Sequence, residues 1–476
     1  METQKENKSL LTTFISYSFG GFGHDVLYAV MSTYLMTFLA TQLFDEANTH
    51  WVVVITTTIM VLRIIELFVD PLIGGTIDKT RSKIGKFKPW ILIGGAVWSL
   101  ALIFLFTDMF SLPVNNPLFY VVVFSAVYLI MDFAFSFKDA AYWGMVSAIA
   151  IDSGTRNKLG TAARIGSVSG QAVVMIAAVP IIKFFSGSSS LRVSSEAIGD
   201  KTGWFIFGLI GTILAFITCI IVAVGTKESK QAIRTQNDHI GIKQIFSTLA
   251  KNDQLMWIAG SYIFFCLAQL TTQILLLPYF TYVVGNADLY SGIGVINLVA
   301  SFISVAIFPI LTKFIGRKQL YIICIILMIV GMLLFLVSGS NVPIAYVGYL
   351  FFQFPYPILF LCVMLTIADT VEYGQWKNGT RAEAATLVVR VMCDKLGGAI
   401  SNGVMGLVAI FCGIHAGATS ETFAANPQNL INFKILMIGL PALFMLISAA
   451  LYKTKVKIDE KMHEKIVKEL EERAKS

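Results

Sequence analysis

Long apolar stretches alternate with short polar ones along the whole 476-residue chain. A helix needs about 20 apolar residues to cross the hydrocarbon of a bilayer, and many of these stretches reach that length. The pattern predicts an all-α polytopic membrane protein with twelve transmembrane helices. The expected spans are 10–40, 52–78, 89–108, 117–151, 160–185, 203–226, 257–284, 290–312, 319–337, 343–372, 384–412 and 431–453.

The composition agrees with a membrane location. Hydrophobic residues make up 56% of the chain and charged residues 14%, whereas soluble proteins carry roughly 25% charged residues. The net charge of +7 does not indicate a nucleic-acid partner, because the cations lie in short loops between apolar runs, where they set membrane topology. The six cysteines lie within or beside apolar runs without paired spacing, and no ATP-binding phosphate loop is present. We therefore expect no disulfide, metal or resident cofactor.

The basic loops give the expected orientation. Segments rich in Lys and Arg recur after every second span, and the positive-inside rule places such segments in the cytoplasm. Both termini are therefore expected in the cytoplasm, with the protein in the plasma membrane. The longest basic segment divides the spans six and six. The expected parts are an N-terminal bundle (1–226), a cytoplasmic middle loop (227–256), a C-terminal bundle (257–454) and a cytoplasmic tail (455–476).

Two smaller patterns refine this organisation. The segments 74–79 and 313–318 are turns of glycine and basic residues at corresponding places, which suggests two related halves. The tail has a four-residue apolar repeat, which predicts an amphipathic helix resting on the protein or on the membrane surface. The repeat consists of Ile458, Met462, Ile466 and Leu470. No signal-peptide cleavage is expected at the start, and no further domain after the tail.

Two carboxylates, Glu66 and Asp70, lie inside the second expected span. Their i, i+4 spacing puts them on one helix face. Burying one carboxylate in hydrocarbon is costly, and a second one on the next turn adds to the cost. Such a pair persists most easily where it binds a cation, takes up a proton or faces a fixed positive charge. We interpret the pair as the cation-coupling site of a transporter.

Carboxylates in two other spans suit a sugar. Asp25 follows a glycine-rich stretch in the first span, where it either binds a ligand or caps a helix break. Its neighbour His24 is the one histidine that invites a test. Ser136, Asp139 and Trp143 share a face of the fourth span. A carboxylate beside an indole can bind both the hydroxyls and the apolar ring face of a sugar.

Several cations also lie within the spans. Lys138 points about 100° away from Asp139 and either faces the acid pair of the second span or forms a structural charge pair with Asp139. Arg164, near the start of the fifth span, either holds a carboxylate or reaches lipid headgroups. In the eleventh span, Arg390 and Asp394 have the spacing of an ion pair. Lys395 beside them offers a donor toward the cavity or balances a distant acid.

Another charged cluster lies at the cytoplasmic end of the tenth and eleventh expected spans. It consists of Asp369, Glu372, Arg381 and Glu383. Because this position is at the membrane surface, we interpret the cluster as a gate of salt bridges and not as a substrate site.

These segments together resemble the glycoside–pentoside–hexuronide:cation symporters, the melibiose permease family of the major facilitator superfamily. The resemblance covers nearly the whole chain and looks closest to the gram-positive lactose and isoprimeverose carriers. Some of those carry a C-terminal phosphotransferase-like regulatory domain, which we do not expect here. The segments that carry the resemblance are 17–25, 70–90, 139–143, 251–255 and 368–374.

The resemblance implies a fold of two six-helix bundles around a central sugar site. The sugar-binding residues that it implies are Asp25, Asp139, Trp143, Arg164 and Lys395, to which we add Arg390. The cation-site residues that it implies are Glu66, Asp70 and Ser136, to which we add Lys138.

Three positions depart from the family pattern. Glu66 stands where the melibiose carriers have Asp, Val69 where they have Asn, and Lys138 where their pattern is apolar. Losing an amide oxygen and adding a fixed cation nearby both weaken a sodium site. We therefore expect a proton as the co-transported ion, carried by Glu66 or Asp70, with sodium as the alternative.

The sequence thus predicts a symporter, not an enzyme, that imports a glycoside or oligosaccharide by alternating access. Galactosides, xylosides and uronides all suit these residue types. A hexuronide carrier is one alternative, in which the intramembrane cations bind a uronate. A membrane sugar sensor that does not transport is an alternative from another class. The sequence gives no oligomeric state.

Overall fold

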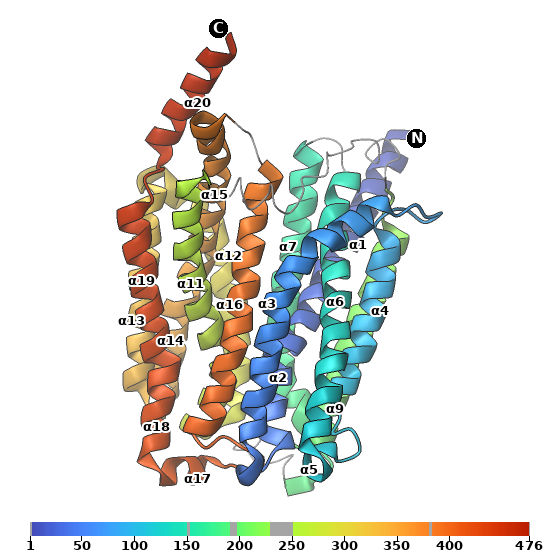
Figure 1. Cartoon of the computed structure of the whole chain (residues 1–476), viewed down its shortest axis with the longest axis vertical. Helices are drawn as coiled ribbons and strands as arrows, with labels where there is room; N and C mark the ends of the chain where they lie inside the picture. Colours follow the sequence, from blue (N-terminus) through green and yellow to red (C-terminus); the bar gives the residue numbers. More distant parts are fainter. Residues whose placement is uncertain (1, 150–152, 191–197, 229–250, 380–382, 476) are drawn as a thin grey trace. The chain divides into compact units, whose positions relative to one another are not determined.

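All regular elements in the described part of the chain are helices. The computed structural model describes residues 2–149, 153–190, 198–228, 251–379 and 383–475 (Figure 1). The helices of the first half are α1 (Glu2–Ala29), α2 (Leu35–Phe38), α3 (His50–Lys79), α4 (Lys88–Leu105), α5 (Leu112–Asn115), α6 (Pro117–Ile149), α7 (Ser153–Phe184) and α9 (Lys201–Gly225). The helices of the second half are α11 (Asp253–Pro278), α12 (Tyr290–Phe314), α13 (Arg317–Ser338), α14 (Val342–Gln353), α15 (Pro355–Asn378), α16 (Glu383–Phe411), α17 (Ser420–Ala425), α18 (Pro427–Lys434), α19 (Leu440–Lys455) and α20 (Glu460–Lys475). The predicted all-α fold is confirmed.

Eleven helical stretches among the described residues are long and apolar enough to cross a membrane. The remaining expected span corresponds to α16, which carries three charged residues in its middle, Arg390, Asp394 and Lys395. Large apolar side chains on the spans face outward, such as Leu100, which is 69% exposed, and Val224, which is 80% exposed. Such surfaces need lipid around them, so the helices agree with the expected twelve spans of a membrane protein.

The chain forms two compact units, and each is described by itself. Unit 1 comprises Met1–His239, Phe280–Gly294 and Met405–Ala425. Unit 2 comprises Ile240–Tyr279, Val295–Val404 and Asn426–Ser476. The expected division at 226 and 257 follows the order of the chain and stays a prediction.

Close packing of α1 on α7 organises unit 1. Glycines at the contact allow the two backbones to meet, as small residues do between membrane helices. A Cβ atom at Gly166 would lie 1.9 Å from the carbonyl oxygen of Ser18, and one at Gly170 would lie 2.2 Å from that of Phe22. Gly21 of α1 lies equally close to α7. No larger residue can occupy these positions unless the helices move apart.

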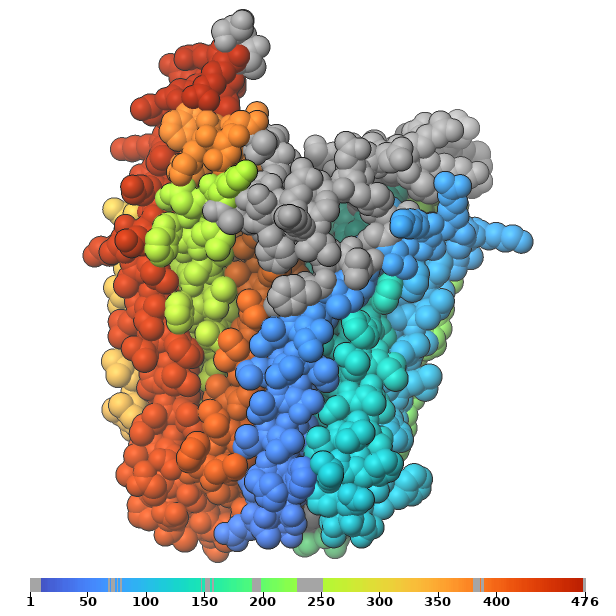
Figure 2. All heavy atoms as spheres, viewed as in Figure 1, coloured from blue at the N-terminus to red at the C-terminus, as the bar shows by residue number. Residues whose placement is uncertain are grey.

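The helices α3, α4 and α6 form the next layer of unit 1. Both α3 and α4 pack against α6, and α4 also packs on α9. In the face that Figure 2 shows, α3 and α6 lie side by side. Gly94 of α4 approaches the backbone of α6 beside Lys138, where a Cβ atom would lie 2.8 Å from the Ala134 carbonyl oxygen. These contacts place the polar faces of α1, α3 and α6 within one unit.

The second-half segment around Asp288 packs on first-half helices within unit 1. Asp288 Oδ1 lies 2.7 Å from Nζ of Lys183 on α7, and Lys183 is buried. Tyr290 and Tyr34 meet edge to face, with ring centres 6.4 Å apart. A Cβ atom at Gly294 would lie 2.9 Å from the backbone nitrogen of Ile176. The segment from Asp288 to Gly294 therefore contacts α7 and Tyr34 of the first span.

The two halves of the chain have the same lysine contact at corresponding sequence positions. Lys88 Nζ donates to the carbonyl of Thr226 at 2.6 Å, and Lys318 Nζ donates to that of Val456 at 2.6 Å. Each pair is separated by 138 residues, and the second lies 230 positions after the first. A carboxylate that follows the last span of each half, Glu228 or Glu460, accepts the backbone N–H of the residue before the lysine. These matching contacts support the prediction of two related halves.

The tail forms α20, as its apolar repeat predicts, and lies at the end of α15 (Figure 1). Ile458 and Ile466 are buried against Tyr373, with Met462, Leu470 and Trp376 packed around them. Lys457 N and Glu460 add hydrogen bonds to α11 and α13. Of the two surfaces expected for this helix, the structure has it resting on the protein.

Candidate functional site

Two of the expected sugar-binding residues of unit 1 lie at the glycine-lined contact between α1 and α7. Ser167 of α7 donates a hydrogen bond to the Asp25 carboxylate of α1. Arg164 lies on the same face of α7, three residues earlier, and its charge acts on Asp25. Arg164 is exposed and Asp25 is partly exposed. The structure therefore brings a carboxylate and a guanidinium to the same helix contact.

The carboxylate of Asp139 lies on the adjacent helix α6 and is held by His24. His24 Nε2 lies 3.2 Å from Asp139 Oδ1, and the Asp139 side chain is 23% exposed. The other ring nitrogen, Nδ1, lies 3.1 Å from Lys138 Nζ. Since His24 and Asp25 are neighbours in the chain, Asp25 and Asp139 belong to one group of polar side chains.

Aromatic side chains pack beside this group of polar residues. Tyr17 and Tyr142 stack with ring centres 4.5 Å apart, and each hydroxyl donates to the other residue's carbonyl. Trp143 meets Tyr142 edge to face at 5.2 Å and is only partly buried. Trp143 follows Asp139 by one helical turn, so the indole lies on the same face of α6 as that carboxylate.

The expected cation-coupling residues Glu66 and Ser136 also meet. The Ser136 hydroxyl of α6 donates to the Glu66 carboxylate of α3, and both side chains are buried. Arg63, one turn before Glu66, is buried as well, and its Nε donates to the Tyr128 hydroxyl at 2.8 Å. The charges of Glu66 and Asp132 act on Arg63. A fixed cation thus lies beside Glu66, which lowers the cost of keeping an ionised carboxylate in the membrane.

Two expectations for this region need comment. The side chain of Asp70 lies outside the described residues. Lys138 was expected to face either the acid pair or Asp139. Its described partner is His24, with Nζ also 5.2 Å from the ring centre of Trp98. That it faces the acid pair stays a prediction, because the Asp70 side chain lies outside the described residues. The structure adds Arg63 as a cation whose charge acts together with that of Glu66.

In unit 2, the predicted ion pair of α16 is confirmed. Arg390 Nη1 lies 2.7 Å from Asp394 Oδ2. Tyr262 of α11 donates to the same carboxylate at 2.7 Å. The Arg390 guanidinium also lies 5.5 Å from the ring centre of Phe360. Lys395 is partly buried on α16. That Arg390 and Lys395 share a cavity with the carboxylates of unit 1 stays a prediction.

Two members of the expected gate, Asp369 and Glu372, lie near the end of α15 in a cluster with charged residues that the sequence analysis did not assign to the gate. Arg317 Nη2 lies 2.5 Å from Asp369 Oδ2, and Arg317 Nε lies 3.1 Å from Glu460 of α20. His463 Nε2 lies 3.7 Å from both Asp369 and Glu372. The other two expected members cannot be placed, because Arg381 and the side chain of Glu383 lie outside the described residues. The cluster therefore ties α20 to α13 and α15.

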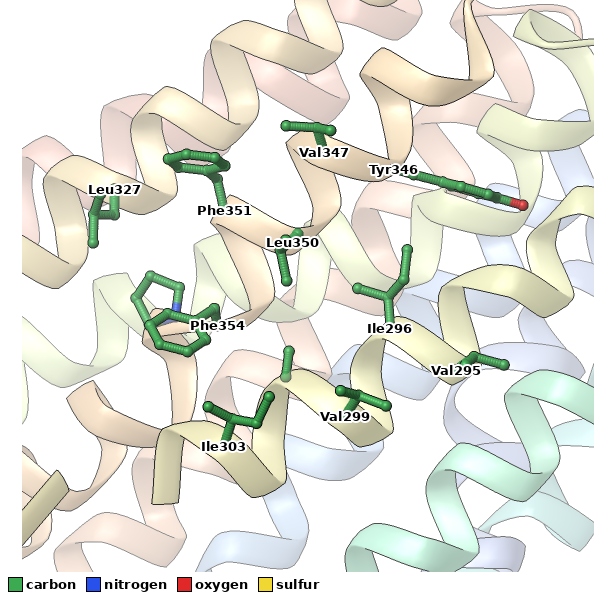
Figure 3. Close-up of a pocket in the computed structure, with 12 residues that line it drawn as sticks. Val295, Ile296, Val299, Ile303, Leu327, Tyr346, Val347, Leu350, Phe351 and Phe354 are labelled. Atoms are coloured by element: carbon green, nitrogen blue, oxygen red, sulfur yellow. The ribbon is translucent and has the colours of Figure 1, made fainter. Parts of the chain in front are cut away.

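An apolar groove of about 750 Å³ opens on unit 2 (Figure 3). Its lining includes Val295, Val299 and Leu350, and Tyr346 is the one residue of the lining with a polar side chain. Val299 is 52% exposed on a membrane-spanning helix, where lipid surrounds it. Such a lining offers no set of hydrogen-bond partners to sugar hydroxyls, so the groove is not the sugar site.

The sequence analysis missed four participating residues, Arg63, His24 as a bridge, Arg317 and His463. Arg63 begins the turn before Glu66, so its i, i+3 spacing was a usable indication. Arg317 lies in a basic loop whose charges were assigned to topology alone. His24 and His463 contact carboxylates of distant helices, and helix periodicity does not reveal such partners.

Comparisons with known proteins agree on one family. A family model described as MFS/sugar transport protein matches residues 16–460. The lactose permease of Lactobacillus delbrueckii subsp. bulgaricus is 43% identical over 464 residues, covering 98% of this chain and 73% of that protein. The raffinose carrier protein of Pediococcus pentosaceus is 40% identical over 460 residues, covering 96% of this chain and 70% of that protein. A crystal structure of a D-xylose-proton symporter is similar in fold, with a TM-score of 0.66 at 15% identity, and covers 94% of this chain and 98% of that one.

Proposed function

The chain belongs to the MFS/sugar transport protein family, and we propose that it imports a galactoside together with a proton. The grouping of Asp25, Asp139 and Trp143 carries the proposal. Ionised carboxylates accept hydrogen bonds from sugar hydroxyls, and a partly open indole stacks on the apolar face of the ring. Two of its relatives are named for lactose and raffinose, which both contain a galactosyl unit, and this supports the choice of a galactoside.

We assign the coupling proton to the acid pair of α3. Glu66 is buried, contacts a hydroxyl that can donate or accept, and lies beside the fixed cation Arg63. A buried carboxylate with such neighbours gains or loses a proton at modest cost, because Arg63 compensates the ionised form and Ser136 can bond to either form. The charge of Glu66 then depends on the proton, and a symporter can link that charge to closure around the sugar.

The orientation is part of the proposal. Both termini and the middle loop at 227–256 lie in the cytoplasm, because the basic loops all fall on that side. The salt-bridge cluster of Arg317, Asp369 and Glu460 then lies at the cytoplasmic surface, and the Lys183–Asp288 contact lies at the external one.

The first test measures external pH in a weakly buffered suspension of de-energised cells that express the chain, without added sodium. Adding a galactoside should make the medium more alkaline as protons enter with the sugar. Xylosides and uronides are added in separate runs, and alkalinisation with a uronide alone would replace the galactoside with a hexuronide. Sugar entry that needs sodium and leaves external pH unchanged would contradict proton coupling.

Variants then separate sugar binding from coupling. Asp139→Asn should lose sugar accumulation, because the amide cannot replace an ionised acceptor. Glu66→Gln should keep sugar exchange across the membrane but lose uphill accumulation, because the amide does not titrate. Glu46→Gln, which changes an exposed carboxylate in a short 3-10 helix, is the control and should behave as the parent chain. Normal accumulation by Asp139→Asn would rule out the proposed site.

A further inference from the structure

Asp132 is a buried carboxylate of α6, one helical turn before Ser136. The residue is 2% exposed and lies within a stretch that can cross the membrane. A carboxylate in the membrane interior is costly to keep, and such residues are usually paired and functional. The contacts of the neighbouring turns of α6 show which groups Asp132 faces.

Three polar side chains spaced four residues apart share one face of α6: Tyr128, Asp132 and Ser136. The helices α3 and α6 pack side by side, and the first and last members of this row both bond to α3 (Figure 2). The Tyr128 hydroxyl accepts from Arg63 Nε at 2.8 Å, and the Ser136 hydroxyl donates to the Glu66 carboxylate. Because Asp132 lies between these two contacts on the same face, it faces the turn of α3 that carries Arg63 and Glu66.

One buried cation is shared by two carboxylates at this contact. Arg63 is 5% exposed, and the charges of Asp132 and Glu66 both act on its guanidinium. Tyr28 of α1 and Tyr128 also act on it, but tyrosine hydroxyls are neutral near neutral pH. The side chain of Asp70, one turn beyond Glu66, lies outside the described residues.

The other charged groups near α6 in unit 1 belong to the sugar-binding group. From α4, the residues 89–105 include no titratable side chain. The charged and titratable groups of α1, α6 and α7 at the sugar-binding group act on one another, and they are His24, Asp25, Lys138, Asp139 and Arg164.

The two carboxylates have opposing effects on proton uptake. Arg63 favours the ionised form of Glu66, because an opposite charge nearby stabilises a charged carboxylate. A second negative charge nearby has the reverse effect and favours the protonated form. Asp132 therefore offsets part of the hold that Arg63 has on ionised Glu66. Counted over these three side chains, the contact is neutral when Glu66 is protonated and carries one negative charge when it is not.

We propose that Asp132 is a further residue of the coupling site, which offsets part of the charge of Arg63 and so eases protonation of Glu66. The proposal rests on the assignment of the coupling proton to Glu66 given above. Tyr128 supports the arrangement, because its hydroxyl holds the guanidinium against the same face of α6. Asp132 thus acts on the coupling proton through charge and needs no contact with the sugar.

The test measures how uptake depends on pH. The purified chain is reconstituted into proteoliposomes, and the initial rate of uptake of radiolabelled lactose, a galactoside, is followed at a series of external pH values. The internal pH and the membrane potential are held constant. Uptake that needs a protonated Glu66 is complete at low pH and is lost as pH rises, so each protein has a midpoint pH.

The variants move this midpoint in opposite directions. Asp132→Asn should lower it by about one pH unit, the smaller end of the effect of one neighbouring charge, because Arg63 then holds the ionised form of Glu66 more strongly. Arg63→Gln should raise the midpoint, and the double variant should lie between the two single variants. Asp132→Glu keeps the charge and should retain the parent's midpoint.

Asp108→Asn is the matched control, because it makes the same change at a side chain that is 31% exposed and lies outside the coupling site. It should leave both the rate and the midpoint unchanged. Thermal melting verifies that each protein is folded. If Asp132→Asn does not fold, the double variant is compared with Arg63→Gln, and loss of Asp132 should lower the midpoint there as well.

A lower maximal rate at the parent's midpoint would show that Asp132 is merely structural and would overturn the proposal. A midpoint that rises in Asp132→Asn, or that is the same in Arg63→Gln and the double variant, would also overturn it. Failure of the proposed function would look different, because the parent itself would then take up no lactose or would do so equally at every pH. A uronide or xyloside taken up by the parent would replace lactose in the same comparison.

Discussion

The contact between α1 and α7 makes a quantitative prediction for Gly166→Ala. The added methyl group would lie 1.9 Å from the Ser18 carbonyl oxygen, whereas ordinary contact begins at 3.4 Å. The helices must therefore separate locally by about 1.5 Å, the difference between these two distances. Overpacking of this kind costs about 1–3 kcal/mol, and the better helix propensity of alanine returns up to about 1 kcal/mol. The net destabilisation expected is about 0–3 kcal/mol.

Sugar binding should suffer more than stability does. Ser167 adjoins Gly166, so the same displacement carries its hydroxyl away from Asp25. Misplacement of about 1 Å in a functional site can cost roughly 100-fold in activity, and we expect at least a tenfold loss of sugar affinity. Isothermal titration with a galactoside measures the affinity, and thermal melting in detergent measures the stability.

Gly160 offers a matched control on the same helix. A Cβ atom there would meet nothing within 4 Å. Gly160→Ala should therefore keep full sugar affinity and raise stability by up to about 1 kcal/mol. If Gly166→Ala binds sugar and melts as Gly160→Ala does, then the close contact of α1 with α7 does not position Asp25.

Three shorter predictions concern the ends of the helices. Asp288→Asn should lower the melting temperature more than Lys183→Met does, because it leaves a buried ammonium without its carboxylate, whereas Asp288 itself is half exposed. Burial opposes the charge of Glu460, but the N–H groups of Arg317 outweigh that effect and hold the pKa of the carboxyl below its ordinary value. The docking of α20 should therefore be stable above that ordinary value and weaken as pH falls through the lowered pKa, which hydrogen exchange of 460–475 at neutral and acidic pH would detect. Asp200→Ala should destabilise the chain by about 1 kcal/mol in thermal melting, because its side chain accepts two backbone N–H groups at the start of α9, and an unchanged melting temperature would contradict this role.

Features that depend on one helix at a time could be predicted from the sequence. Apolar length predicted the spans, and the four-residue repeat predicted the buried face of α20. The i, i+4 spacing of Arg390 and Asp394 predicted their ion pair. In each case the helical period alone fixes which residues share a face.

Partners on different helices could not be predicted in this way. The period separates Lys138 and Asp139 around the helix, but it could not show that His24 of α1 contacts both of them. In the same way, it gave Asp369 a place at the end of a span without revealing Arg317 as its partner. Which helix lies opposite a given face depends on tertiary packing, and glycines far along the chain decide that packing.

The 230-residue offset between the matching lysine contacts also relates two carboxylates. Thr366 and Asp369 lie 230 positions after Ser136 and Asp139, so each half has a hydroxyl and an acid with the same spacing. Each acid also faces a histidine from another helix, at 3.2 Å in the first half and 3.7 Å in the second. The second of these acids also contacts the guanidinium of Arg317, so Asp369 anchors a salt bridge at the repeated position. Arg317→Leu should release Asp369 from its guanidinium partner and loosen α20. It should create no sugar site, because the chain has Tyr373 at the position that corresponds to Trp143.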